Sequence, residues 1–484
     1  QFTKNAETVL KTRYLIGDET PEDLLWRVAN AISDPEPDKE YWSQIFFDLM
    51  ASRQFMPNSP TLFNAGTGQG TLSACFVIPI EDTMESIMKA ATTSAMIQKY
   101  GGGIGYAFSK LRSRGSRITT THGKACGATA VLKMLSSLSD MITQGGKRHG
   151  ANMGILHIQH PEILDFIHMK DDNSTAQNFN ISVAITDKFM EAVENNANWD
   201  LIDPHTQETM HTVAARTIWE EIIDSAWQTG DPGLYFIDES NRDNPTPHLG
   251  NLDSTNPCGE VPLLAHEACN LGSINLGKLV KDTGTFDFDQ LTDLTITCTR
   301  FLDNVVTINK FPRQEVADAV AKTRKIGLGI MGWHDALIQM GVPYDSPQAL
   351  ELADTVMGTI NKVSRQSSLE LAEKRGPYPA CKEEIPIRNA TRTCIAPTGS
   401  ISAIASCSSG IEPLFALAFV KNVLDGKQLK EINPYFIDMA RARGFYSEEL
   451  MDQVSQVGSC QHIDEVPEDV KALFKTAMEI PCDI

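Results

Sequence analysis

The sequence predicts an α/β protein with a small helical region at its N-terminus. From Pro57 onward, short apolar strands alternate with longer helical patterns, which is typical of α/β architecture. The chain has 484 residues, which is too long for one simple core and indicates a large domain with a smaller appendage. Hydrophobic residues make up 42% and charged residues 21%, as in ordinary soluble proteins.

The individual elements follow from the spacing of apolar residues. Residues 1–56 read as helical, and the segment DPEP at 34–37 separates two pieces. Amphipathic helices are predicted at 83–100 and 127–144. Strands are predicted at 74–80, 154–158, 179–185, 271–276, 326–331 and 393–396.

Charge and cysteine usage exclude several classes of protein. A net charge of -20 disfavours binding to polymeric nucleic acid, although a local cluster can still bind small anions. The ten cysteines form no C-x-x-C pair, which argues against a disulfide scaffold or a zinc ribbon. No apolar run reaches membrane-spanning length and no signal peptide is visible. We therefore expect a reduced, cytoplasmic protein that does not contact a membrane.

Metal binding by protein side chains is not expected. The histidines at 157, 160 and 168 cluster in the sequence, but the chain contains no H-E-x-x-H motif. Scattered structural histidines are the better interpretation.

The segment NPCGE at 256–260 is the first candidate for chemistry. Proline and glycine on either side of Cys258 predict a tight loop. Such a loop would present an amide, a thiol and a carboxylate to one small substrate. The alternative is an ordinary turn with an incidental cysteine, and the spacing alone favours that alternative.

Three further segments could bind phosphate. PTGS at 397–400 follows a strand-like run and offers hydroxyls and backbone N–H groups, although simple helix capping is commoner. The glycine-rich segments 101–105 and 272–278 lack a complete P-loop, so we assign both to backbone turns. A short basic run holds Lys110, Arg112, Arg114 and Arg117, and is either a solvated face or an anion site.

Several segments, in order along nearly the whole chain, resemble the signatures of ribonucleotide reductase large chains. They include 71–79 with Cys75, 256–260, and 266–276 with Cys269, together with 58–66, 101–105, 145–148 and 397–402. Three stretches resemble class II, the adenosylcobalamin-dependent class: 101–105 before Tyr106, 324–332 and 419–426. The adjacent tyrosine pair that relays the radical in class I has no convincing counterpart.

The resemblance implies a ten-stranded α/β barrel of two five-stranded halves with a central active-site loop. We expect a helical region at 1–56 and the barrel at 57–484. A homodimer is expected, with the helices 83–100 and 127–144 contributing to the contact. Family members continue through further barrel strands to a tail with a redox cysteine pair, and neither precedes Ile484.

The resemblance also implies a reaction, the reduction of ribonucleotides, with diphosphates favoured, to 2′-deoxyribonucleotides. Adenosylcobalamin would yield a radical that oxidises Cys258 to a thiyl, which takes the 3′-hydrogen of the ribose. Glu260 would handle the 3′-hydroxyl proton, and Asn256 would hydrogen-bond the sugar hydroxyls. Cys75 and Cys269 would supply the reducing equivalents, end as a disulfide, and be restored by a thioredoxin-like reductant.

Binding residues follow from the same resemblance. The substrate would contact the catalytic loop and also Ser59, Ala74, Thr398, Gly399, Ser400, Ile401 and Ser402. A dNTP effector would bind Asp82, Lys99, Arg112 and Arg117, and Lys147 and Arg148 in the loop 145–154 would carry its signal. Two alternatives stay open: a class I large subunit, and a non-catalytic nucleotide-binding paralogue or fragment.

Overall fold

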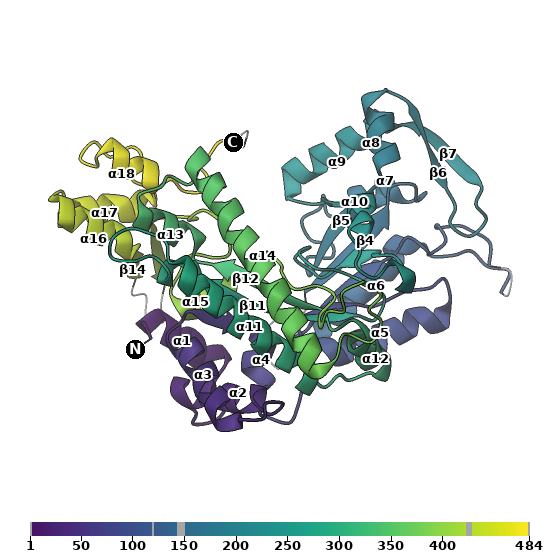
Figure 1. Ribbon diagram of the computed structural model, residues 1–484. Helices are drawn as coiled ribbons and strands as arrows, with labels where there is room; N and C mark the ends of the chain where they lie inside the picture. Colours follow the sequence, from purple (N-terminus) through teal and green to yellow (C-terminus); the bar gives the residue numbers. More distant parts are fainter. Residues whose placement is uncertain (1, 119–120, 143–150, 423–427, 483–484) are drawn as a thin grey trace.

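The computed structural model describes residues 2–118, 121–142, 151–422 and 428–482. The N-terminal region is helical, as predicted, with α1 (Lys4–Arg13), α2 (Pro21–Ile32) and α3 (Lys39–Ala51). Thr20 and Asp23 form a capping box that fixes the start of α2. The short strand β1 (Phe55–Pro57) and α4 (Ser59–Asn64) then lead the chain into the sheet (Figure 1).

Five parallel strands form the first half of the sheet. Their order is β2 (Cys75–Val77), β3 (Gly103–Ala107), β4 (Asn152–His157), β5 (Phe179–Ile185) and β8 (Gly233–Phe236). The connecting helices are α5 (Met84–Gln98), α6 (Ala128–Met141), α7 (Ile163–Ile167), α8 (Asp187–Glu194) and α9 (Ala215–Thr229), followed by α10 (Ile237–Arg242). A hairpin of β6 (Asn198–Ile202) and β7 (Thr209–Ala214) lies outside this sheet.

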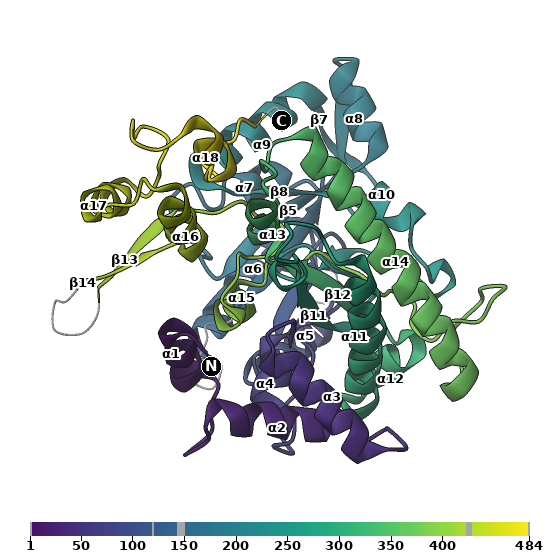
Figure 2. The ribbon, with the colours of Figure 1, turned by 60° about the vertical axis from the view of Figure 1, so that its left-hand side comes forward.

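The strand direction reverses where the second half begins. Strand β11 (Ala268–Asn275) runs antiparallel to β2 and β1 and parallel to β12 (Ile326–Met331). Thr393 adds a parallel bridge to Leu328 at the far edge of β12. The long helices α11 (Phe288–Ile308) and α14 (Pro347–Arg375) run alongside β11 and β12 (Figure 2). The described strands therefore comprise one complete five-stranded half and the beginning of a second.

The C-terminal part completes this side of the molecule with short elements. They are α12 (Gln314–Thr323), α13 (Trp333–Met340), α15 (Gly399–Ala405), β13 (Ala418–Asn422), β14 (Gln428–Ile432), α16 (Pro434–Arg443), α17 (Glu448–Val457) and α18 (Glu468–Leu473). Among the described residues, no helix is both long enough and apolar enough to cross a membrane.

The predicted elements compare well with the observed ones. The helices predicted at 83–100 and 127–144 are α5 and α6, and the strands predicted at 179–185 and 326–331 have those bounds. The strand predicted at 393–396 is wrong, because this segment makes only the isolated bridge at Thr393 before Pro397 interrupts it.

A buried ionic cluster ties the N-terminal helices to the barrel. Glu36 and Asp303 are its two carboxylates, and both side chains are fully buried. Burial alone would raise the pKa of each. Hydrogen bonds from arginine and asparagine outweigh burial at Glu36, and the positive charges of Arg324 and Arg388 with their hydrogen bonds do so at Asp303, so both pKa values are lowered. The partners of the two carboxylates are Arg300, Asn304, Arg324, Arg375, Arg388 and Asn389.

Candidate active site

Cys258 lies at the turn of a short hairpin between β9 (Ser254–Thr255) and β10 (Pro262–Leu263). Asn256 holds this turn, because its backbone oxygen accepts from the N–H of Gly259 at 3.0 Å and its side-chain oxygen accepts from the N–H of Val261 at 3.0 Å. Gly259 adopts a φ of 86°, which favours glycine. The predicted tight loop at 256–260 is confirmed.

The glycines of β3 let this hairpin lie directly against the sheet. A Cβ at Gly105 would stand 1.6 Å from the backbone oxygen of Thr255, and one at Gly103 would stand 2.7 Å from Cγ of Pro257. Asn180 on β5 donates to the backbone oxygen of Pro257 at 2.7 Å. Our assignment of 101–105 to a turn was therefore wrong beyond its first residues. Residues 103–105 belong to strand β3, and the absence of side chains at Gly103 and Gly105 makes room for the loop 256–260.

Two buried cysteines face each other beneath this hairpin. Cys75 on β2 and Cys269 on β11 are direct partners in the antiparallel pair, an arrangement that brings Cα atoms to about 4.5–5.5 Å. The predicted proximity of these two thiols is confirmed. Burial raises the pKa of both. Cys258 is exposed instead, so the three cysteines differ in what can reach them.

Asn256 connects the loop to the buried pair. Its side-chain nitrogen lies 3.2 Å from Sγ of Cys75 and donates to Oε2 of Glu260 at 2.5 Å. Burial raises the pKa of Glu260, and the bond from Asn256 opposes this shift only in part. A carboxyl group with a raised pKa is a stronger base than an ordinary carboxylate, which suits the transfer of a proton. The amide, the carboxyl and the thiols thus form one cluster.

A fourth cysteine belongs to this cluster and was missed by the sequence analysis. Cys394 packs against the apolar residues around Cys75 and Cys269. Its Sγ lies over Gly327 of β12, where a Cβ would stand 2.8 Å away. Burial raises its pKa, and the nearby Cys269 and Glu260 add to this effect. The only sequence signal was its place just ahead of the predicted phosphate loop.

The predicted phosphate segment begins beside the thiols. Ala396 packs in the same cluster as Cys75 and Cys269, and α15 starts at Gly399. The first bond within this helix runs from the N–H of Ser402 to the oxygen of Thr398 at 2.9 Å, so the N–H groups of residues 399–401 precede it. A Cβ at Gly399 would meet no atom within 4 Å, which leaves open space before the helix start.

The remaining predicted substrate residues lie on neighbouring elements. Ala74 packs against the thiol cluster just before β2. Ser59, at the start of α4, is buried and shares a 2.8 Å hydrogen bond with the hydroxyl of Tyr14. Contacts between α15 and β1, which ends two residues before Ser59, bring α15 to the region where α4 starts.

The predicted effector residues are only partly brought together. Arg112 pairs with Asp82 at 2.7 Å, and its Nη1 donates to the backbone oxygen of Arg117 at 3.2 Å. Lys99 caps the opposite end of α5, a helix of 15 residues and therefore about 22 Å long. Within one chain it does not share a site with Asp82. Lys147 and Arg148 lie outside the described residues.

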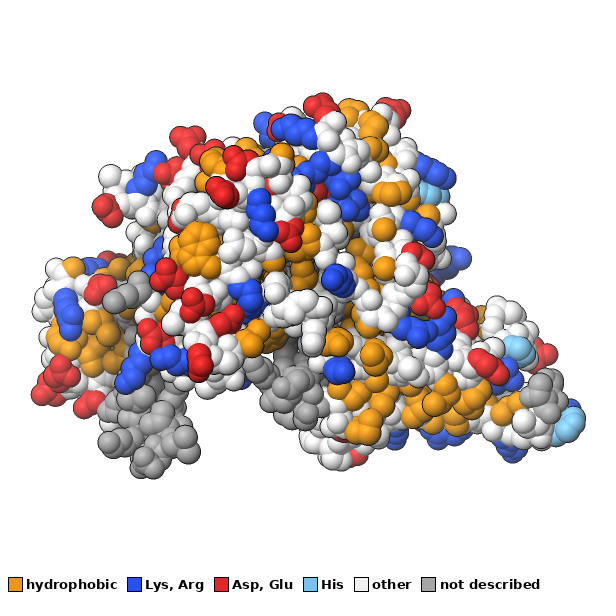
Figure 3. All heavy atoms as spheres, turned by 90° about the horizontal axis from the view of Figure 1, so that it is seen from below, with side chains coloured by type: hydrophobic (Ala, Val, Ile, Leu, Met, Phe, Trp, Pro, Cys, Tyr) orange, Lys and Arg blue, Asp and Glu red, His pale blue; other side chains and the backbone are white. Residues whose placement is uncertain are grey.

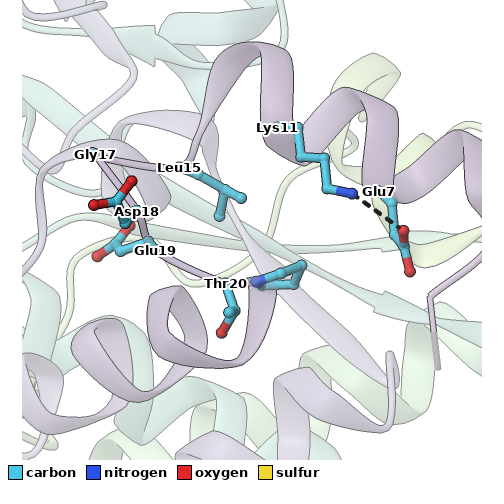
Figure 4. A pocket seen from close by; sticks show the side chains of 8 residues that line it. Glu7, Lys11, Leu15, Gly17, Asp18, Glu19 and Thr20 are labelled. Atoms are coloured by element: carbon cyan, nitrogen blue, oxygen red, sulfur yellow. Dashed lines mark ion pairs between the residues drawn. The ribbon is translucent and has the colours of Figure 1, made fainter.

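Two pockets have walls that include none of Cys75, Cys258, Cys269 and Cys394. One of about 600 Å³ is bordered by the end of α15, residues 406–417 and the start of α16, and Ser402 is the only predicted site residue on its wall. The other, of about 470 Å³, lies between α1 and α2 and is lined by Glu7, Lys11, Asp18 and Glu19 among others (Figure 4). No group of three or more potential metal ligands is present in the described part of the chain.

Comparison with known families agrees with this geometry. The profile of the ribonucleotide reductase barrel domain matches residues 73–384 and 382–483, and that of the family's all-alpha domain matches residues 1–70. The chain belongs to the ribonucleotide reductase family. The two profiles meet after β1 and α4, whereas the sequence analysis placed the boundary after residue 56.

Individual relatives carry more specific names. The chain is 50% identical over 442 residues to a vitamin B12-dependent ribonucleoside-diphosphate reductase of Thermoplasma acidophilum, covering 90% of this chain and 57% of that protein. A protein of the same name from Mycobacterium tuberculosis is 42% identical, covering 98% and 71%. The ribonucleoside-diphosphate reductase subunit alpha of Chlamydia muridarum is 30% identical, covering 99% and 54%. The chain thus spans 54% to 71% of the length of these relatives.

A solved structure supports the fold. The class Id ribonucleotide reductase alpha subunit of Actinobacillus ureae superposes with a TM-score of 0.81, covering 98% of this chain and 86% of that one. Its sequence identity is 24%, so the likeness concerns the fold alone.

Proposed function

We propose that this protein reduces ribonucleoside diphosphates to 2′-deoxyribonucleoside diphosphates with adenosylcobalamin as cofactor. The observation that carries the proposal is the single cluster in which Asn256 joins Glu260 to the pair Cys75 and Cys269, in a loop that has Cys258 at its turn. The names of the relatives from Thermoplasma acidophilum and Mycobacterium tuberculosis support both the substrate class and the cofactor.

The residues around the loop fit such a cofactor. Cys258 and Gly259 are exposed at the turn of the hairpin, whereas Cys75 and Cys269 are 3% and 1% exposed. A large group can therefore approach only one of these three thiols. Pro257, Cys258 and Gly259 would form the protein side of that site. When bound, adenosylcobalamin would supply the hydrogen-abstracting radical that no side chain can generate alone.

The chain's own residues would then perform the reduction. The thiyl of Cys258 takes the hydrogen atom from C3′, while Glu260 accepts the 3′-hydroxyl proton and Asn256 holds the sugar hydroxyls. The thiols of Cys75 and Cys269 give two electrons and two protons as the 2′-hydroxyl leaves as water. The pair becomes a disulfide, and Cys258 recovers its radical when the hydrogen atom returns to C3′. Burial of the pair keeps solvent from the two thiols while they are oxidised.

We place the substrate phosphates at the start of α15. The N–H groups of Gly399, Ser400 and Ile401 and the hydroxyls of Thr398 and Ser402 would bind them, with help from Ser59. Several donors oriented before binding suit a multiply charged phosphate group, and the helix dipole adds to the attraction. This local attraction explains how a protein with a net charge of -20 holds an anionic substrate.

Allosteric control by a dNTP is proposed for the region of Asp82, Arg112 and Arg117. Asp82 would accept from the ribose hydroxyl and the arginines would hold phosphates. Lys99 could join this site only from a second copy of the chain, because it lies at the far end of α5. Effector binding should change substrate affinity by a coupling of about 1–3 kcal/mol. Equal substrate affinity with and without every dNTP would contradict the assignment.

A homodimer through α5 and α6 fits this arrangement. Large apolar side chains are exposed on these helices, including Met84 at 67%, Met88 at 50% and Met141 at 74%. The view from below also shows hydrophobic side chains gathered in a band on the surface (Figure 3). Exposed apolar patches commonly mark protein interfaces. A cytoplasmic location fits the proposed cycle, because the cycle needs reduced thiols.

The decisive experiment measures deoxyribonucleotide formation by the full-length protein with a dithiol reductant, with and without adenosylcobalamin. Turnover that requires adenosylcobalamin and no second protein is the expected result. Turnover only with a metal-containing second subunit would favour the class I alternative. Effector binding without any turnover would instead favour a non-catalytic paralogue.

A further inference from the structure

A buried ion pair lies at the base of the two facing cysteines. The ammonium of Lys325 contacts Oε2 of Glu267 at 2.6 Å, and the two side chains are 1% and 2% exposed. Bringing both charges out of water costs several kcal/mol per ion, and apolar replacements of such pairs are often as stable. Stability alone therefore does not explain why charged residues occupy this place.

The strand register puts this ion pair beside Cys269 and away from Cys75. Strands β11 and β12 are parallel and pair Asn270 with Ile326, so Lys325 stands next to Cys269. Glu267 lies just before β11, two positions ahead of Cys269, and in extended backbone it therefore points to the same face as Cys269. Cys75, on the other side of Cys269, faces the side chain of Asn256 in the catalytic loop.

The two thiols consequently experience different electrostatic surroundings. Burial raises the pKa of Cys269, and the positive charge of Lys325 is the largest influence that lowers it, against Glu267 and Glu260. Burial also raises the pKa of Cys75, and its charged neighbours among the described residues, headed by Glu260, raise it further. Among the charged neighbours in the described part of the chain, a cation stabilises a thiolate at Cys269 and none does so at Cys75.

The hydrogen bonds of the ion pair favour the effect of the cation. Glu267 accepts from the N–H of Leu264 at 2.7 Å and from the hydroxyl of Thr323 at 2.6 Å, in addition to the bond from Lys325. These donors disperse the negative charge of the carboxylate. An ammonium has three N–H donors, and the bond to Glu267 uses one of them. The carboxylate of Glu267 therefore neutralises the charge of Lys325 less on the side that faces Cys269.

We propose that Lys325 polarises the redox pair, so that Cys269 leaves as a thiolate when the Cys75–Cys269 disulfide is reduced and Cys75 receives the attack. The proposal rests on the redox role of these cysteines under the proposed function. It makes Lys325 a positioning residue for the regeneration of the enzyme, since it acts through Cys269 and does not touch the substrate.

The step balances as an ordinary thiol–disulfide exchange. A thiolate of a dithiol reductant attacks Sγ of Cys75, the S–S bond breaks, and its electron pair stays on Sγ of Cys269 beside Lys325. The second thiol of the reductant then attacks its own sulfur in the mixed disulfide and releases Cys75. Cys269 and Cys75 take up the two protons of the dithiol. A leaving sulfur with a lower pKa departs faster, which is the effect that Lys325 provides.

The test follows reduction of the disulfide without turnover, so its failure is distinct from failure of the proposed activity. The full-length Cys258→Ser protein is oxidised with diamide, and peptide mapping verifies the Cys75–Cys269 disulfide. A pulse of 2-mercaptoethanol is stopped with acid, and the cysteine that carries the adduct is identified by mass spectrometry. The expected adduct is on Cys75. An adduct mainly on Cys269 would overturn the proposal.

Variants then test the charge itself across a range of pH. Lys325→Met should slow reduction by roughly three- to thirtyfold, because a nearby charge is worth one to three pKa units and the rate follows about half of that. Lys325→Arg keeps the charge and should stay within about threefold of the parent rate. Lys170→Met removes a different buried lysine, paired with Asp231 at 2.7 Å, and controls for general loss of stability.

Glu267→Gln separates electrostatics from structure. If the ion pair had a purely structural role, Lys325→Met and Glu267→Gln would slow reduction equally. The proposal predicts that Glu267→Gln does not slow it, since removing the anion cannot weaken the stabilisation of the Cys269 thiolate. Equal slowing of the two variants, or unchanged rates in Lys325→Met, would refute the role of Lys325.

Discussion

Gly105→Ala tests whether the active-site loop depends on its close approach to β3. The new Cβ would stand 1.6 Å from the backbone oxygen of Thr255, which is far closer than any Cβ contact in real proteins. The contacting atom belongs to the backbone, so no side-chain rotation relieves it. Either β3 or the hairpin β9–β10 must therefore move by roughly 1 Å or more.

The magnitude follows from where that displacement falls. Thr255 immediately precedes Asn256, whose side chain contacts Cys75 at 3.2 Å and Glu260 at 2.5 Å. A misplacement of about 1 Å in a reacting group can cost about 100-fold in rate. We expect turnover of the full-length protein to fall by about that factor, while overpacking lowers the free energy of unfolding by about 1–3 kcal/mol.

The assays are deoxyribonucleotide formation and urea unfolding. Gly358→Ala is the matched control, because a Cβ at this helical position meets no atom within 4 Å. It should leave turnover unchanged and stabilise the protein by up to about 1 kcal/mol. Full turnover in Gly105→Ala, with a stability equal to the parent, would refute the proposed packing of the loop on β3.

Three further predictions concern single residues. Cys258→Ser should abolish turnover and change the free energy of unfolding by less than about 0.5 kcal/mol, since the side chain is exposed; substantial residual nucleotide reduction would remove the assignment. Ser400→Asp should weaken substrate binding in calorimetry by about tenfold or more and leave effector binding intact; unchanged substrate binding would place the phosphates elsewhere. Glu36 should make stability acid-sensitive: its pKa of about 2 lies below the ordinary 4.5, so its contribution is present above pH 4.5 and is lost as pH falls toward 2. Urea unfolding should show that the free energy of unfolding falls by on the order of 3 kcal/mol in this window because of Glu36. Glu36→Gln has no carboxyl group to titrate, so this part of the pH dependence should be missing from the variant.

The sequence by itself determined the local parts of the site. The run of apolar residues at 326–331 and the alternation at 179–185 predicted strands with the observed bounds, because each pattern is set within a few neighbouring residues. Proline and glycine around Cys258 predicted the tight turn for the same reason. The ordered motifs then indicated the family, which the comparisons confirm.

Only the tertiary structure decided which of these local parts meet. The antiparallel register that sets Cys75 opposite Cys269 depends on how whole strands pack, and no local periodicity encodes it. The same holds for Lys325 beside Cys269 and for the hairpin above Gly105. Lys99 and Asp82 are separated by the whole length of α5, and residue spacing alone did not show that this distance keeps them out of one binding site. Contacts between distant segments arise from the packing of the complete barrel, and residues near one another in sequence carry little information about that packing.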